Sequence, residues 1–241
     1  METPQHLDPG FSEAERAERR AGLRERFADL PFELHDVHLD NYMDAEFRLS
    51  DAVDRLDVIG DIEIGPVTPD DVEDVLAFFD HDAFAGKPEW AMCYCRFNHV
   101  DVEKEWGERT WQQNRAELAD ALRSGAMRAV IARVDGRIVA WLNCSDRASS
   151  PEYATGDDDG VAQTFCWSVA PPYRGHGLAR SLLETAIEIL SADGIRTVEG
   201  HAVVDPDDAS TAYVGTKALY ESCGFAIVDE SDGRAKVTRH L

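Results

Sequence analysis

Basic residues are scarce in this sequence, and lysine is the scarcest of them. The chain of 241 residues has 24 Lys and Arg residues against 47 Asp and Glu residues, and its formal net charge at pH 7 is −23. Only four of the basic residues are lysine. Proteins that bind nucleic acid need the opposite field, because Lys and Arg neutralise the phosphate backbone. The composition therefore predicts no nucleic-acid partner.

The acidity itself has two interpretations. An acidic field can draw a cationic substrate toward the protein. Alternatively, an acidic and lysine-poor surface keeps a protein hydrated in high salt, as an adaptation of a whole proteome. The acidic residues are spread along the chain and do not cluster near the motifs described below. This distribution favours the second interpretation, that of a halophile-like protein.

Long apolar runs are also lacking. No run approaches the ~20 residues of a membrane-spanning helix. Met1–Gly10 has no basic start followed by an apolar stretch, so it does not resemble a secretory signal. We therefore expect a cytoplasmic protein that has no membrane partner. With 44% hydrophobic residues, the chain has enough apolar side chains to form a packed core.

Cysteine is too sparse for a disulfide framework. The sequence holds five cysteines, an odd number, and disulfides are rare in the cytoplasm. Cys144, Cys166 and Cys223 lie in apolar or strand-like segments, which predicts that they are small buried residues.

Cys93 and Cys95, together with His99, form a C-x-C-x3-H pattern that offers three soft metal ligands. Structural zinc sites take four ligands, commonly with C-x(2–4)-C spacing. The sequence has no second cluster of such ligands, so we predict no metal site. The favoured alternative is a strand that places both thiols on one face, close to the ligand cleft predicted below.

The chain is predicted to have two parts, a helical and irregular acidic appendage at 1–60 and a main domain at 61–241. Ser12 and Glu15 fit a capping box that opens a charged helix extending to about Leu30. Residues 32–60 are acidic and weakly patterned. The appendage could be a second layer packed on the domain, a dimer contact or partly disordered.

The predicted elements of the main domain alternate between strands and helices. A first strand is expected at 62–67. Thr68-Pro69-Asp70-Asp71 predicts a helix start, because a capping residue precedes a proline and two acids. Asp135-Gly136 is a strong hairpin signal. The remaining predicted elements are a helix at 102–123, strands at 127–133 and 137–143, a polar loop at 146–160, and a final hairpin formed by 225–228 and 234–240.

The most informative segment is Tyr-Arg-Gly-His-Gly-Leu-Ala at 173–179. It lies between the apolar run Thr164–Ala170 and a helix whose apolar residues recur on one face until Gly194. Glycines let the chain curl so that successive amide N–H groups point inward. A helix start adds unpaired N–H groups and the positive end of its dipole. This pattern is typical of a phosphate cradle, although a tight turn without a ligand has the same glycines.

The spacing of the glycines indicates which kind of cradle this is. Residues 174–179 lack the lysine and the Ser/Thr of a P-loop and the three glycines of the dinucleotide fingerprint. They fit R/Q-x-x-G-x-G/A, the acyl-CoA pyrophosphate motif of the GCN5-related N-acetyltransferases (GNAT). Ala-Leu-Tyr-Glu-Ser-Cys-Gly-Phe at 218–225 resembles that family's A-x-x-L-Y-E-x-x-G-F segment, but is one residue shorter before the Leu-Tyr pair. About 80 residues, with both motifs in order, resemble the GNAT superfamily.

The resemblance implies a mixed α/β (α+β) fold. The GNAT fold has a central mixed, mostly antiparallel twisted sheet of six to seven strands, flanked by helices and splayed at the acyl-CoA site. Glu199-Gly200-His201, residues 212–216 and Cys93-Tyr94-Cys95 further resemble an uncharacterised subgroup of the family. That subgroup implies no particular substrate.

The resemblance also implies acetyl-CoA as the cosubstrate. The backbone N–H groups of the cradle would anchor its pyrophosphate, with Arg174 as an additional charge contact. The backbone at Val169 and Ala170 is where the family contacts the pantetheine arm and the thioester, and a β-bulge there admits the arm between two strands. The predicted cofactor-binding residues are Val169, Ala170, Arg174, Gly175, His176, Gly177, Leu178 and Ala179.

Tyr220 is the predicted general acid, since it matches the family tyrosine that protonates the CoA sulfur. Its alternative role is that of an aromatic residue packed beside Phe225. The general base is harder to identify, because the cofactor-side strand at 163–169 carries no carboxylate. Glu199 and His201 on the next strand are the candidates. Alternation places them on the same face, and His201 has a suitable unperturbed pKa.

These inferences predict an enzyme that transfers an acetyl group from acetyl-CoA to a primary amine of a small molecule by direct attack, without a covalent enzyme intermediate. Trp90, Tyr94, Trp141 and Trp167 could line the acceptor pocket or belong to the core. Two alternatives remain open: a protein N-acetyltransferase, and a non-catalytic acyl-CoA-binding sensor or interaction module. A homodimer is a further assembly that the sequence allows.

Overall fold

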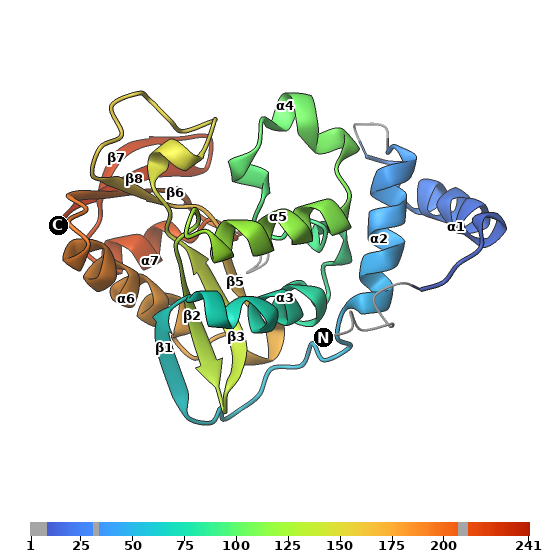
Figure 1. Cartoon of the computed structure of the whole chain (residues 1–241), viewed down its shortest axis with the longest axis horizontal. Coiled ribbons are helices and arrows are strands. Elements are labelled where there is room, and N and C mark those ends of the chain that lie inside the picture. Colours follow the sequence, from blue (N-terminus) through green and yellow to red (C-terminus); the bar gives the residue numbers. More distant parts are fainter. Residues whose placement is uncertain (1–8, 31–33, 207–211) are drawn as a thin grey trace.

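The computed structural model of the protein describes residues 9–30, 34–206 and 212–241, which form a mixed α/β fold with two four-stranded sheets (Figure 1). The first sheet has the order β1-β2-β3-β5 and consists of β1 (Ile62–Pro66), β2 (Ala129–Val134), β3 (Arg137–Asn143) and β5 (Trp167–Val169). The second has the order β4-β6-β8-β7 and consists of β4 (Val161–Thr164), β6 (Thr197–Val203), β8 (Arg234–His240) and β7 (Ala226–Ser231). Among these described strands only β4 and β6 pair in parallel, so the expected mixed, mostly antiparallel architecture is confirmed.

The predicted cofactor-side strand is divided between the two sheets, which is why the described residues form eight strands where six to seven are expected. β4 ends at Thr164 and pairs with β6, whereas β5 begins at Trp167 and pairs with β3. Beyond the break the chain continues as β5, which is not paired with β6 in the described structure. The Trp167 N–H donates to the Tyr213 carbonyl (2.8 Å), and the Val203 N–H donates to the Gly215 carbonyl (3.0 Å). The two strands are therefore splayed, with the chain around Tyr213 between them.

Helices cover both faces of the first sheet. α3 (Val72–His81) and α5 (Trp111–Arg123) lie on one face, where Ile131 and Trp141 belong to their core (Figure 1). α6 (Leu178–Ala192) packs on the other face, against residues that include Leu142. α7 (Lys217–Ser222) packs on the second sheet. Because both faces of β2 and β3 are buried, these strands carry near-continuous apolar sequence.

The predicted helix at 102–123 is interrupted. It consists of the short α4 (Val102–Glu105), a 3-10 turn at Trp106–Glu108, and α5. Gly107 lies in the turn, and the Thr110 hydroxyl caps α5 by accepting the Gln113 N–H (3.3 Å), so a new helix begins there. Within the described ranges, no helix is both long and apolar enough to cross a membrane.

The N-terminal segment packs on the rest of the protein as an additional layer. α1 (Glu13–Arg26) has the predicted capping box, with the Ser12 N–H donating to the Glu15 carboxylate (2.8 Å), but it ends before Leu30. α2 (Asp36–Arg48) carries a fully buried guanidinium at Arg48, which donates to the Tyr94 hydroxyl (2.6 Å). Ala45 and the residue after the helix belong to the core shared with α3. The domain boundary at 60/61 stays a prediction.

Candidate active site

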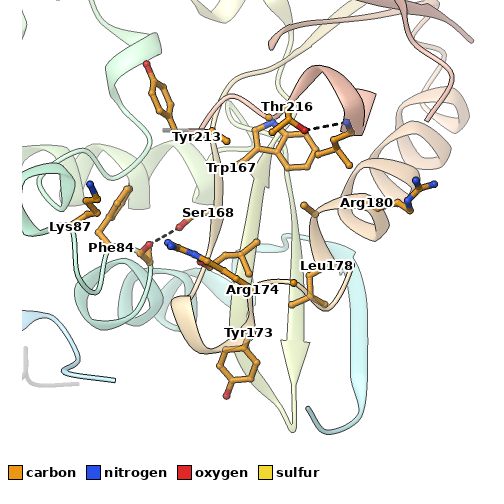
Figure 2. Close-up of a pocket in the computed structure, with 18 of the residues that line it drawn as sticks. Phe84, Lys87, Trp167, Ser168, Tyr173, Arg174, Leu178, Arg180, Tyr213 and Thr216 are labelled. Carbon is orange, nitrogen blue, oxygen red and sulfur yellow. Dashed lines mark hydrogen bonds between the residues drawn. The ribbon is translucent and has the colours of Figure 1, made fainter. Parts of the chain in front are cut away.

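A cleft of about 510 Å³ opens where β5 and β6 diverge (Figure 2). Its floor is β5. One wall is the glycine-rich turn and the first residues of α6, and the opposite wall is the chain after α3, from Ala83 to Trp90. The segment from Ala212 to α7 borders the third side. The volume is typical of a small-molecule or cofactor site.

The glycine-rich turn has the geometry of an anion cradle. Gly175 and Gly177 have φ angles of +83° and +82°, a region that side chains rarely adopt. Gly177 is the N-cap of α6, and no side chain caps the helix, so its first N–H groups remain available at the positive end of the dipole. An anion in the cleft would accept hydrogen bonds from these N–H groups.

Six of the eight predicted cofactor-binding residues line this cleft: Val169, Arg174, Gly175, Gly177, Leu178 and Ala179. The other two are used elsewhere. The Ala170 N–H donates to the Val139 carbonyl (2.9 Å), and the His176 ring is hydrogen-bonded to the Leu56 carbonyl (2.9 Å). Arg174 lies along the floor, where its Nε donates to the Val169 carbonyl (3.0 Å) (Figure 2). Ligand contacts of all eight residues stay predictions.

The N-terminal segment reaches the cradle, which sequence reasoning did not foresee. The Leu56 N–H donates to the Pro172 carbonyl (2.8 Å), so this stretch is tied to the turn on both sides. The Arg55 guanidinium lies against Gly175, where an added Cβ would be 3.0 Å from its Nη1. Among the described residues Arg55 has no hydrogen-bond or ion-pair partner. No local motif in the sequence marks this arginine; only the tertiary contact identifies it.

The charge of the cleft is opposite to that of the chain. Its described lining contains Lys87, Arg174 and Arg180 but no Asp or Glu, although 47 of the 241 residues are acidic. Arg180 also pairs with Glu184 (3.8 Å), which lies outside the lining. Three cations in a described lining that has no carboxylate favour an anionic ligand, because each of them attracts it.

Tyr220 lies behind the cleft rather than on its lining. The side chain is fully buried, and its hydroxyl is hydrogen-bonded to the Thr164 hydroxyl (2.5 Å), the Trp167 indole N–H (3.3 Å) and the Val214 carbonyl (3.0 Å). Burial raises the pKa of Tyr220 to about 12, against the lowering effect of the bonds to Thr164 and Trp167. A Cβ on Gly200 would lie 2.8 Å from this hydroxyl, which explains a glycine at that strand position. The role of Tyr220 as general acid stays a prediction.

Glu199 and His201 also lie outside the cleft lining. Glu199 accepts from Arg147 (3.0 Å) and pairs with Lys236 (3.3 Å), so both of its partners are cations. His201 stacks on Tyr153, with ring centroids 4.6 Å apart. Burial, and then the charge of Lys236, lower the pKa of His201. Their roles as general base stay predictions.

Cys93 and Cys95 are not on a strand, so that expectation was wrong. They lie at a tight turn, in which Tyr94 and Cys95 have positive φ angles of 44° and 58°. The buried Cys95 sulfur accepts from the Asn143 amide (3.2 Å), and burial raises the pKa of Cys93 to about 11. His99 is hydrogen-bonded to Asn143 and to the Ser149 carbonyl. In the part of the chain that the structure describes, no group of three or more His, Cys, Asp or Glu residues is placed to hold a metal ion.

Two of the four candidate acceptor-site aromatics line the cleft. Trp167 forms part of the floor, and Trp90 packs edge-on against Tyr213, with ring centroids 5.0 Å apart. Tyr94 and Trp141 are fully buried in the core. Their burial shows that they support the fold rather than face a ligand.

The comparison with family models agrees with the motifs. The sequence model of the acetyltransferase (GNAT) family matches residues 90–225. A GCN5-related N-acetyltransferase structure from Kribbella flavida is 20% identical, with a TM-score of 0.49, over 75% of this chain and 98% of that one. PaiA N-acetyltransferase from Thermoplasma acidophilum, solved in complex with coenzyme A, is 15% identical, with a TM-score of 0.45, over 75% and 99%. Ribosomal-protein-alanine N-acetyltransferase from Brucella melitensis is 17% identical, with a TM-score of 0.45, over 74% and 99%. No curated protein matches the sequence.

Proposed function

The chain belongs to the acetyltransferase (GNAT) family, and from this premise we propose that it is an acetyl-CoA-dependent N-acetyltransferase that acts on a primary amine of a small molecule. The observation that carries the proposal is the cleft itself. It combines a glycine cradle at a helix start with three cations and no described carboxylate. Coenzyme A is a polyanion with a long uncharged arm, and this lining suits both parts.

The pyrophosphate of acetyl-CoA would occupy the cradle, bound by the N–H groups at the start of α6. Arg174 would leave its bond to the Val169 carbonyl and turn to the phosphates, which frees that carbonyl for the pantetheine amide. Arg55 would add a second guanidinium beside Gly175. The Asp/Glu-free lining means that no phosphate oxygen would meet a described carboxylate in the cleft.

The reaction is a direct acyl transfer. The neutral amine nitrogen attacks the thioester carbon, a C–N bond forms, and the carbonyl oxygen becomes an oxyanion. The C–S bond then breaks, the amine proton is lost to a base, and the thiolate of CoA takes up a proton. Tyr220 is the candidate donor of that proton, and Glu199 and His201 are the candidate bases, each acting through water because none lines the cleft.

Of the two alternative functions, one is favoured by a particular observation and the other is opposed by one. A non-catalytic acyl-CoA sensor is favoured by the pairing of Glu199 with two cations and the stacking of His201 on a ring, so that neither predicted base is in the described lining of the cleft. A protein N-acetyltransferase would need an acidic groove for a cationic peptide, and the described lining has no acidic residue. The small-molecule enzyme therefore remains the proposal, with the sensor as second candidate.

Calorimetric titration with acetyl-CoA and with CoA, in high potassium chloride, tests the cofactor. Gly177→Val fills the mouth of the cradle, and Gly194→Val is its matched control, because both glycines flank α6, both have a φ of +82°, and both face open space. We expect binding to wild type and Gly194→Val but at least about tenfold weaker binding to Gly177→Val. A ligand at 100 times its Kd should also raise the free energy of unfolding by ~2.7 kcal/mol. If neither ligand binds wild type, the cradle is only a tight turn, and the proposed function falls.

A further inference from the structure

We infer that Lys87 anchors an anionic group of the acceptor, so that the amine substrate also carries a carboxylate. This inference rests on the proposed function, since it assigns the part of the cleft that acetyl-CoA leaves open. Lys87 lies on the wall formed by the chain after α3, and Figure 2 shows it across the cleft from Leu178 and Arg180.

The position of Lys87 is fixed by the fold. Its N–H donates to the Phe84 carbonyl (2.7 Å), which closes a tight turn after α3. One residue before Phe84, the Ala83 carbonyl accepts from the Ser168 hydroxyl of β5 (2.9 Å). The wall that carries the lysine is therefore bonded directly to the floor along which the pantetheine arm would run.

Lys87 differs from the other three lysines of the chain because its side chain has no hydrogen-bond or ion-pair partner among the described residues. Lys104 pairs with Asp101, Lys217 pairs with Glu230 (2.5 Å), and Lys236 pairs with Glu199 (3.3 Å). Lys87 has no side-chain hydrogen bond or ion pair with any described residue. A half-buried lysine residue with no described counter-charge, on the wall of a cleft, can pair with an anionic group that a ligand supplies.

The surroundings of Lys87 point to the acceptor rather than to the cofactor. The phosphates of CoA have Arg174, Arg180 and the N–H groups of α6 on the opposite wall. Trp90 lies on the same wall as Lys87, and Tyr213 packs edge-on against it from the third side, so the two rings offer an apolar surface for the body of a small molecule. A polycationic acceptor would need carboxylates to bind it, and the described lining has none. An amino acid, with its amine near the thioester and its carboxylate on Lys87, matches both features.

The test compares each of the twenty common amino acids with its own amide, and both with putrescine and spermidine, as acceptors. Acetylated product is measured by mass spectrometry for wild type, Lys87→Gln, Lys87→Arg and Lys104→Gln, a matched change at an exposed lysine outside the cleft. Calorimetry gives the Kd of acetyl-CoA for each variant. We expect at least one acid to exceed its amide in kcat/KM by about tenfold or more, because the hydrogen-bonded ion pair is lost in the amide.

Lys87→Gln should remove that preference by raising KM for the acid, whereas Lys87→Arg and Lys104→Gln should keep it. The Kd of acetyl-CoA should not change in Lys87→Gln. The inference is overturned if no acid is preferred to its amide, including the case of no turnover, or if Lys87→Gln weakens acetyl-CoA as much as the acceptor. Absence of acetyl-CoA binding to wild type would instead defeat the proposed function, so the two failures are distinguishable.

Discussion

Replacing Tyr220 with Phe separates a structural role of its hydroxyl from a catalytic one. The hydroxyl is the shared partner of three groups in a fully buried network, the Thr164 hydroxyl, the Trp167 indole N–H and the Val214 carbonyl. Thr164 keeps a second partner, because its hydroxyl also donates to the Glu199 carbonyl (3.2 Å). The substitution therefore leaves the Trp167 donor and the Val214 acceptor without this partner.

The size of the effect on stability follows from those lost bonds. A buried polar group that loses its partner costs about 1–3 kcal/mol. At roughly 2 kcal/mol, and with ~2–4 °C per kcal/mol for a chain of this size, the melting temperature should fall by about 4–8 °C. Tyr173→Phe is the stability control, since the Tyr173 hydroxyl has no hydrogen bond to a described residue and points away from the cleft (Figure 2).

The catalytic effect is measured separately, by kcat at a temperature at which both proteins are folded. Transfer of a proton, through water, from a phenol with a pKa of about 12 to a thiolate with a pKa near 8.5 is uphill by roughly 5 kcal/mol, so the buried position makes Tyr220 a weak donor. If Tyr220 is nevertheless the acid, kcat should fall by ~10²–10⁴ while the Kd of acetyl-CoA is unchanged. An unaltered kcat would remove Tyr220 from the mechanism. A wild-type melting temperature would refute the account of the buried network.

Two further predictions concern groups that the cleft and its surroundings bring together. Arg55→Gln should raise the Kd of CoA by about 3- to 10-fold without changing the melting temperature, because the residue is exposed and its guanidinium has no partner among the described residues. Arg19→Gln on α1 is the control, and equal affinities of the two variants for CoA would remove Arg55 from the phosphate site. Burial, and then the charge of Arg96, lower the pKa of His99 to about 4, so the unfolded chain binds a proton at pH 5 that the folded protein does not. The free energy of unfolding, measured by urea titration, should therefore fall by at most about 2 kcal/mol from pH 7 to pH 5, and the fall should be smaller in His99→Gln. An equal fall in wild type and His99→Gln would contradict the lowered pKa of His99.

Elements set by local patterns could be predicted closely from the sequence. The hairpin at Asp135-Gly136, the capping box at Ser12 and the helix after Gly177 all depend on residues within a few positions of one another. The glycine cradle belongs to this class, because its φ angles are required by the turn itself. The sequence predicts a strand at 163–169. That this segment divides between two sheets depends on its pairing with β3 and β6, which are distant in sequence.

The candidate site could be predicted from the sequence only where the segment that would bind the ligand is also the segment that carries the motif. Tyr220 was found by its motif, yet its burial depends on Thr164, Trp167 and Val214, which no local pattern connects to it. The sequence alone makes Glu199 a candidate base, but in the folded chain Arg147, 52 residues away, donates a hydrogen bond to its carboxylate. The type of a residue therefore does not show whether its side chain is available to a ligand, because that depends on its partners in the folded chain.

The net charge of the chain is a second property from which the ligand could not be predicted. A formal charge of −23 favours cationic ligands if it is taken as a property of the whole surface, yet the cleft has three cations and no described carboxylate. The two facts are compatible because exposed charges more than ~8–10 Å apart are largely screened at moderate salt, whereas charges in contact with a ligand in a partly closed cleft are screened much less. Net charge thus acts on solubility and on distant encounter, and the few charges at contact distance decide what binds. In a protein this acidic, a cation at the cleft that has no hydrogen-bond or ion-pair partner among the described residues is an informative observation, which is why Lys87 and Arg55 indicate a ligand more strongly than the carboxylates do.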